Sequence, residues 1–276
     1  MIRRLTKLLP GLAAFVCVVA CAPTMASSQP ARSDRIAIEY LDPVNTAHKP
    51  LNEVLKANQV LERVRDVLTR VSWPRTLRLT LKGCDGESNA WYVDARVVVC
   101  YEYLESTWSS ANSSKRPSGI SREDAFIGPL VDVFLHEASH ALFDLLKIPL
   151  LGREEDAADQ LATYYMLQFP AETKRKFILG SAYVYADELK VRSVRDLHRR
   201  RLKVGRYITF ADEHGTPAQR LYNLLCLAYG SDVDLFAEIV ERGYLPKERA
   251  EVCWDEYQQV DFAYHTLISP HVDSDP

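Results

Sequence analysis

Hydrophobic positions recur at helix or strand spacing through the first part of the chain. Between residues 51 and 71 the apolar side chains lie three or four positions apart, which predicts one long amphipathic helix. Residues 76–81 alternate between apolar and polar side chains, as a half-buried strand does. Residues 89–93 and 96–101 are short strand-like segments on either side of Asp94-Ala95, and together they predict a hairpin.

The later pattern is mostly helical. Residues 127–135 form an apolar run that predicts a helix with Pro129 in its first turn, where a missing N–H costs little. Thr216 followed by Pro217 is typical of the start of another helix. Residues 105–121 are rich in Ser, Asn and Gly and are expected to form a loop before the first of these helices. Further helices are predicted at residues 171–189, 231–242 and 249–267.

The apolar run at 127–135 leads directly into His136-Glu137-Ala138-Ser139-His140. On a helix His136 and His140 share one face, so both imidazoles can reach the same metal ion. Glu137 projects about 100° away from His136, where it can take a proton from a water without ligating the metal. This is the H-E-x-x-H pattern of zinc hydrolases, although the pentapeptide also occurs by chance and a histidine on an apolar helix is often a core residue.

A zinc site needs a third protein ligand. The arrangement with Gly and a third His downstream is excluded, because Phe143 and Leu146 occupy those positions. The alternative is a carboxylate from a following helix, and residues 153–162 offer Glu155 and Asp159 four positions apart on one face. We expect Glu155 to ligate the metal and Asp159 to accept the spare N–H of one of the histidines.

A different interpretation of this acidic segment is a solvated helix start, where carboxylates interact favourably with the helix dipole. That interpretation accounts for Glu154 and Asp156. It does not explain why Glu155 and Asp159 share one face so soon after the pentapeptide.

Taken together, these motifs resemble the gluzincin zinc peptidases, and among them a bacterial family named domain of unknown function 4344, which is described as metallopeptidases. The resemblance spans about residues 35–272 and implies a peptidase-like site with one Zn²⁺ per chain. The pieces that carry it are NAWY at 89–92, CYE at 100–102, HEASHALFD at 136–144, GREEDAADQ at 152–160, DEH at 212–214 and QRLYN at 219–223.

The resemblance also implies a fold. The predicted order of helix, sheet, metal-binding helix and further helices is that of a zincin-like α+β domain, helix-rich with a small mixed sheet before the H-E-x-x-H helix. In such a domain an edge strand runs beside the cleft and can bind an extended peptide, and either residues 89–92 or residues 96–100 would be that strand.

Gluzincin-like sites often contain a His or Tyr from the C-terminal part that stabilises the oxyanion of the reaction. His214 is the candidate here, with Arg220 and Tyr222 as weaker ones. The competing interpretation is that His214 is a structural or surface residue before a helix N-terminus.

The N-terminal segment predicts export. Residues 1–20 contain a basic start and an apolar stretch too short for a stable membrane anchor, as in a signal peptide. The ending before Cys21 resembles a bacterial lipobox, so we favour lipidation of Cys21 over ordinary cleavage after Ala26. Residues 21–34 would be a flexible tether and 35–276 the folded domain, located in the periplasm or anchored to the outer membrane.

The remaining cysteines are consistent with an oxidising compartment, because their number is even. Four cysteines allow three pairings, and we prefer Cys84–Cys100 with Cys226–Cys253 because each closes a local loop. Buried free thiols or cysteine zinc ligands are alternatives, but no Cys-x-x-Cys spacing supports the latter.

Charge excludes one class of partner. Without residues 1–20 the chain has 31 basic and 37 acidic side chains, a net charge of −6, so there is no basic excess to attract nucleic acid. We therefore expect a peptide or protein substrate and no obligate protein partner. The sequence leaves open a second function, an envelope binding or scaffold protein with a structural zinc, although a structural site does not need Glu137. An amidase acting on cell-wall peptide crosslinks would share the mechanism.

Overall fold

The computed structural model describes residues 35–112, 116, 119–188 and 213–273. The predictions for the signal peptide, for Cys21 and for the tether lie outside these residues.

A four-stranded mixed sheet forms the N-terminal part of the domain. The strands are ordered β1–β2–β4–β3, with β1 (Ile36–Tyr40) and β4 (Arg96–Cys100) parallel to β2 (Leu77–Lys82) on either side of it. Strand β3 (Ala90–Val93) pairs antiparallel with β4 and lies at the edge of the sheet. Of the two segments considered as the edge strand, residues 89–92 are therefore the correct choice, while residues 96–100 are interior.

The hairpin between β3 and β4 is confirmed. Asp94 and Ala95 both have positive φ, 47° and 57°, which is the geometry of a two-residue turn that follows the twist of the paired strands.

Beyond β4, helix α3 (Tyr101–Ala111) begins at once. The loop predicted from residue 105 is therefore wrong for its first part, because Leu104, Thr107 and Ala111 have helical spacing and are buried.

The first predicted helix is two helices, α1 (Lys49–Ala57) and α2 (Val60–Leu68). They are separated at Gln59, which has the left-handed φ of 51°. Apolar periodicity continues across the break because both helices bury one face in the core. The apolar periodicity therefore indicates which face of the segment is buried, but it does not show that the helical backbone is continuous.

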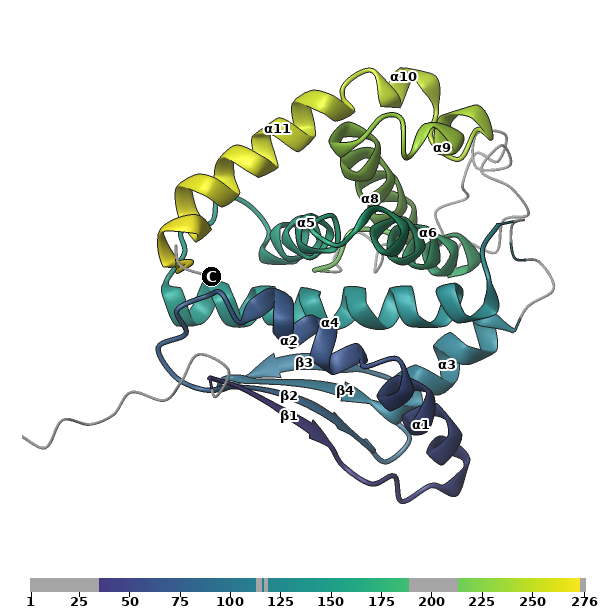
Figure 1. Ribbon diagram of the computed structural model, residues 1–276, viewed down its shortest axis with the longest axis vertical. Coiled ribbons are helices and arrows are strands. Elements are labelled where there is room, and N and C mark those ends of the chain that lie inside the picture. Colours follow the sequence, from purple (N-terminus) through teal and green to yellow (C-terminus); the bar gives the residue numbers. More distant parts are fainter. Residues whose placement is uncertain (1–34, 113–115, 117–118, 189–212, 274–276) are drawn as a thin grey trace, which may run out of the picture. The chain divides into compact units, whose positions relative to one another are not determined.

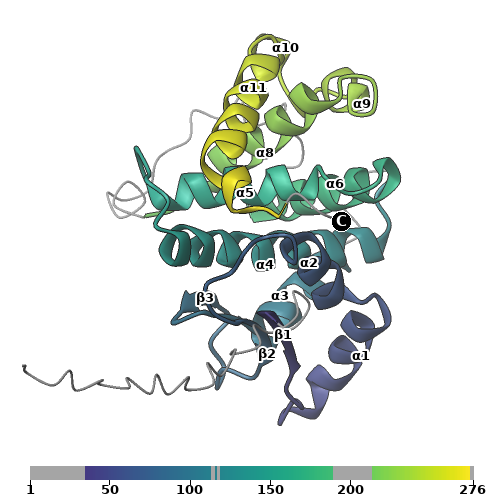
Figure 2. The same cartoon turned by 60° about the vertical axis from the view of Figure 1, so that its left-hand side comes forward.

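Helix α4 (Arg122–Leu146) is 25 residues long and is the central element of the fold. It starts with a capping box between Ser121 and Asp124, so the prediction that Pro129 opens it is wrong. Pro129 lies inside the helix, which continues past it to Leu146, and nearly every residue around Pro129 is buried. Figures 1 and 2 show α4 between the sheet and the later helices, and it contacts β3 and β4 as well as α5 and α6.

Two helices, α5 (Glu154–Met166) and α6 (Ala171–Glu188), pack on the side of α4 away from the sheet, and α8 (Pro217–Ser231) packs on both of them. Helices α4 and α6 approach closely where Gly128 faces Gly180. A Cβ on Gly128 would lie 2.6 Å from the carbonyl oxygen of Phe177. A Cβ on Gly180 would collide with the carbonyl oxygen of Asp124. This close crossing brings the C-terminal half of α6 beside the face of α4 that carries His136 and His140.

The C-terminal part is more broken than its periodicity predicted. Helix α9 (Ala237–Glu241) covers only part of 231–242, and α10 (Lys247–Ala250) and α11 (Cys253–Ala263) replace a single helix at 249–267. The chain stays helical beyond α11, first as a π-helix at Tyr264–Ile268 and then as a 3₁₀ turn at Ser269–His271.

Both predicted disulfides are present, Cys84–Cys100 and Cys226–Cys253. The second joins α8 to α11. In the described part of the chain, no helix combines the length and apolar character needed to cross a membrane.

The structure confirms the α+β class, the excess of helix and the small mixed sheet before the H-E-x-x-H helix.

Candidate metal centre

Two neighbouring helices bring the three predicted ligands together. His136 and His140 lie one turn apart on α4, and Glu155 lies in the first turn of α5. Their ligand atoms are all within 4.8 Å of one another, and His136 is buried. The i, i+4 spacing on α4 and the packing of α5 against it produce this grouping.

The three atoms form a triangle of the size that a tetrahedral ion requires. His136 Nε2 lies 3.0 Å from Glu155 Oε2 and 3.2 Å from His140 Nε2, and the third side, His140 Nε2 to Glu155 Oε2, is 3.5 Å. Donor atoms bound to tetrahedral Zn²⁺ at about 2.0–2.1 Å lie about 3.3 Å from each other. The three residues therefore fit a single ion of that kind, and all three line the same cavity.

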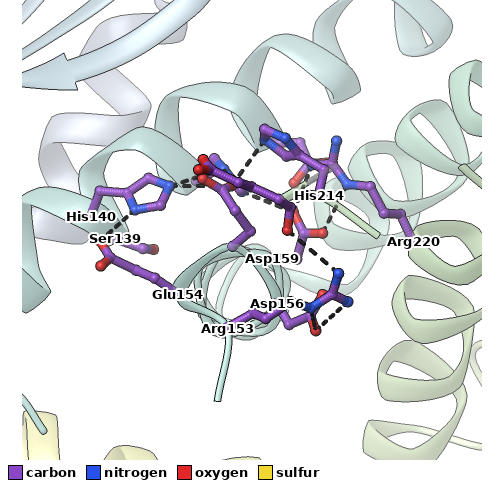
Figure 3. A network of polar contacts seen from close by, with 12 residues as sticks. Ser139, His140, Arg153, Glu154, Asp156, Asp159, His214 and Arg220 are labelled. Atoms are coloured by element: carbon purple, nitrogen blue, oxygen red, sulfur yellow. Dashed lines mark hydrogen bonds and ion pairs between the residues drawn. The ribbon is translucent and has the colours of Figure 1, made fainter. Parts of the chain in front are cut away.

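Each histidine is held through its other ring nitrogen by a carboxylate. His136 Nδ1 lies 2.8 Å from Asp159 Oδ1, and His140 Nδ1 lies 2.8 Å from Glu154 Oε1 (Figure 3). If each Nδ1 carries the proton, both Nε2 atoms are left as metal ligands, which is the usual arrangement around protein-bound zinc. Of the two histidines, His136 is therefore the one that pairs with Asp159. The sequence analysis explained Glu154 only as a solvated residue at the start of a helix, but in the structure it is the partner of His140.

Asp159 is itself fixed by Arg220 of α8. The guanidinium donates two hydrogen bonds to the carboxylate, Nε to Oδ2 at 2.8 Å and Nη2 to Oδ1 at 2.6 Å (Figure 3). It also lies over the ring of Tyr185, 4.8 Å from the ring centre. Arg220 was considered as an oxyanion-stabilising residue, but these contacts make it the partner of Asp159.

His136 and Asp159 shift each other's pKa. Burial lowers the pKa of His136, but hydrogen bonds to Asp159 and Glu155 outweigh burial and raise this pKa to about 9 in the metal-free protein. Burial raises the pKa of Asp159, but the hydrogen bond with His136 and the charge of Arg220 lower it overall. Hydrogen bonds with His136, His140 and His214 hold the pKa of Glu155 far below its usual range.

Glu137 faces the cavity beside the metal ligands and is 8% exposed. Its carboxylate makes no hydrogen bond with another residue of the described chain, and burial raises its pKa. A partly desolvated carboxylate of raised pKa, available to a water in the cavity, has the properties of a general base.

His214 joins the site from the segment before α8. Its Nε2 lies 2.9 Å from Glu155 Oε2, and its ring stacks against that of His136 with 6.0 Å between the ring centres. The hydrogen bond with Glu155 raises its pKa. The competing sequence interpretation is right about the helix start, because Thr216 and Gln219 form a capping box, but the histidine still reaches the site.

Tyr222 does not reach the site. Its hydroxyl is buried without a hydrogen-bond partner among the described residues, and the side chain does not line the cavity.

The cavity at the centre has a volume of about 460 Å³. Residues of β3 form one wall, including Trp91 and Tyr92, and α4 and α6 form others. Helix α6 contributes Ser181 and Tyr185, and Asp132 lies on α4 one turn before His136. The sequence interpretation missed these three side chains. Asp132 could have been found from its i, i+4 spacing to His136, whereas only the tertiary packing brings α6 to the cavity.

Comparison with known proteins gives one family. No curated protein and no solved structure matches the chain. A family model described as "Putative metallopeptidase" matches residues 40–268, which include all of the metal-site residues. The chain therefore belongs to this metallopeptidase family, domain of unknown function 4344.

Proposed function

We propose that the protein is a zinc-dependent peptidase. The observation that carries the proposal is the triangle of His136 Nε2, His140 Nε2 and Glu155 Oε2, with Glu137 on the cavity side. Two imidazoles and a carboxylate are the ligand set of several catalytic zinc sites. When bound there, Zn²⁺ supplies a Lewis acid and lowers the pKa of a ligated water to about 7.

The residues of the chain then have distinct tasks. Glu137 accepts the proton of the attacking water and transfers it to the amine that leaves. Asp159 and Glu154 hold the two histidines in orientation, and Arg220 holds Asp159. His214 lies beside Glu155, within reach of a substrate oxygen, where it would donate a hydrogen bond to the developing oxyanion.

The edge strand β3 supports a peptide as the substrate. It lines the cavity with Ala90, Trp91 and Tyr92, and among the described strands it pairs with β4 alone. An extended peptide could add to its other edge by main-chain hydrogen bonds and so cross the metal centre.

The proposal includes export to the cell envelope with a lipid anchor on Cys21. The two disulfides support an oxidising compartment. The acidic balance of the mature chain supports a substrate other than nucleic acid.

The test compares zinc-loaded wild-type protein with Glu137→Gln on a complex mixture of peptides, with new termini identified by mass spectrometry. We expect the wild type to cut and the variant to bind zinc without cutting. Equal cleavage by the variant would remove Glu137 as the base. A wild type that binds zinc but cleaves no peptide would favour the scaffold function.

A further inference from the structure

A carboxylate that the proposed mechanism does not use lies in the wall of the same cavity. Asp132 is on α4, one turn before His136, and is 6% exposed. Its only hydrogen bond to another described residue comes from the Tyr185 hydroxyl, at 3.2 Å from Oδ2. A single phenol does not offset the cost of burying a charged carboxylate, which normally needs an ion pair or several donors.

The nearest basic side chain is already paired. Both hydrogen-bonded nitrogens of Arg220 go to Asp159, and no basic group of the described chain lies within 4.0 Å of the Asp132 carboxylate. Burial raises the pKa of Asp132 to about 6, which reflects this incomplete compensation. Glu188, exposed at the end of α6, adds a second acidic group to the cavity lining.

A second, independent observation points to a ligand. The Ser181 hydroxyl, on a residue that is 1% exposed, has no hydrogen-bond partner among the described residues, and Ser181 lines the same cavity. Buried hydroxyls in folded proteins are nearly always bonded. Asp132 and Ser181 come from the two helices that cross closely at Gly128 and Gly180, so the packing places both groups at this wall.

We propose that Asp132, with Ser181 and Glu188, forms a subsite that binds a primary ammonium group of the substrate. This inference rests on the proposed peptidase function, because it places the ammonium group of a peptide next to the bond that is cut. A peptide can supply a primary ammonium group in two ways, from the α-amino group at its N-terminus or from the side chain of a Lys residue. One helical turn, about 5.4 Å, separates Asp132 from His136, a distance that either group can span from the scissile bond.

Four small ligands distinguish the sources: lysine amide, norleucine amide, Nα-acetyl-lysine amide and Nα-acetyl-norleucine amide. Binding to zinc-loaded protein is measured by calorimetry in the Glu137→Gln background, which prevents turnover. We expect one of the two singly charged ligands to bind at least about tenfold more tightly than neutral acetyl-norleucine amide, since a charge-assisted hydrogen bond in a buried site has that effect. The preferred one identifies the α-amine or the side chain. Equal binding of all four would overturn the proposal without any further variant.

Asp132→Asn should abolish the preference, while Glu123→Gln, which removes one exposed charge from the same helix away from the cavity, should keep it. Glu188→Gln, an exposed change with little risk to folding, should weaken the preference about twofold. A preference that persists in Asp132→Asn would contradict the subsite and would indicate direct ligation of the zinc by the amine. Cleavage is measured separately on wild-type protein, so an absence of hydrolysis would count against the peptidase function and leave the binding result intact.

Discussion

The carboxylate of Asp159 connects the candidate metal ligand His136 to the cation Arg220. Its Oδ1 lies 2.8 Å from His136 Nδ1 and 2.6 Å from Arg220 Nη2. The three residues come from α4, α5 and α8, so the orientation of a metal ligand depends on the packing of three helices.

Replacing Asp159 by Asn should weaken zinc binding about 10- to 100-fold, because His136 loses the partner that fixes its tautomer and ring orientation. The measurement is competition with a chelator of known zinc affinity. Glu154→Gln is the matched variant, since Glu154 holds His140 in the same way but is more than half exposed. We expect a smaller loss of zinc affinity in Glu154→Gln than in Asp159→Asn. A larger loss in Glu154→Gln would contradict the expectation that the more buried carboxylate contributes more to zinc binding.

Replacing Arg220 by Met should lower the free energy of unfolding of the metal-free protein by about 3 kcal/mol, because the mostly buried Asp159 carboxylate loses the guanidinium and keeps His136 as its remaining charged partner. Denaturant unfolding measures this. Arg153→Met is the control: Arg153 also pairs with an aspartate, Asp156, but on the surface, where a pair contributes less than about 1 kcal/mol. Equal losses in both variants would refute the structural role of Arg220.

Zinc affinity should rise with pH between about 6.5 and 9. The pKa of His136 is raised to about 9 in the metal-free protein, so below that pH zinc must displace a proton from the ring. The apparent affinity then increases up to about tenfold per pH unit, and about one proton is released for each zinc bound. Calorimetry near pH 7.5 in buffers of different ionisation enthalpy counts the protons, and a count of zero would contradict the protonated His136.

The same shift affects the metal-free fold in the opposite direction. A histidine whose pKa is raised on folding stabilises the protein fully below the unfolded pKa of about 6.5, and this stabilisation is lost as pH rises through about 9. The metal-free protein should therefore be less resistant to denaturant at pH 9 than at pH 6.5. His136→Gln should remove most of this pH dependence; if the full dependence remains, another group is responsible.

The sequence predicted the part of the site that depends on local geometry. His136, His140, Glu155 and Asp159 lie in pairs four residues apart on helices, so the spacing alone shows which side chains share a face. The partner of Asp159 could not be predicted in this way, because Arg220 is 61 residues away on a helix whose position depends on tertiary packing.

The same distinction holds for the fold. The hairpin was predictable because its signal is local, and the two disulfides because each pairing closes a local loop. The break at Gln59 and the start of α4 at Arg122 were missed. In the first case the buried face continues across a change in backbone direction, and in the second a capping box lies upstream of the apolar run that was taken as the helix.

Loss of the first disulfide should destabilise the domain. Cys84–Cys100 ties the segment before β3 to the end of β4, with a sequence separation of 16 residues. The double variant Cys84→Ala/Cys100→Ala should lower the free energy of unfolding by about 3 kcal/mol in the chain-entropy model. Mass mapping without reduction should recover both predicted crosslinks, and a free thiol at Cys84 in the wild type would contradict the assignment.

The most direct test of the metal centre is the zinc content of the purified protein, measured by elemental mass spectrometry. The proteins compared are the wild type, Glu155→Ala and Asp156→Ala. The adjacent Asp156 is the control because its carboxylate pairs with Arg153 and does not belong to the ligand group. We predict close to one zinc per chain in the wild type and in Asp156→Ala, and a sharp loss in Glu155→Ala. A wild type that takes up no zinc after reconstitution, or a Glu155→Ala variant that retains it, would contradict the three-ligand centre.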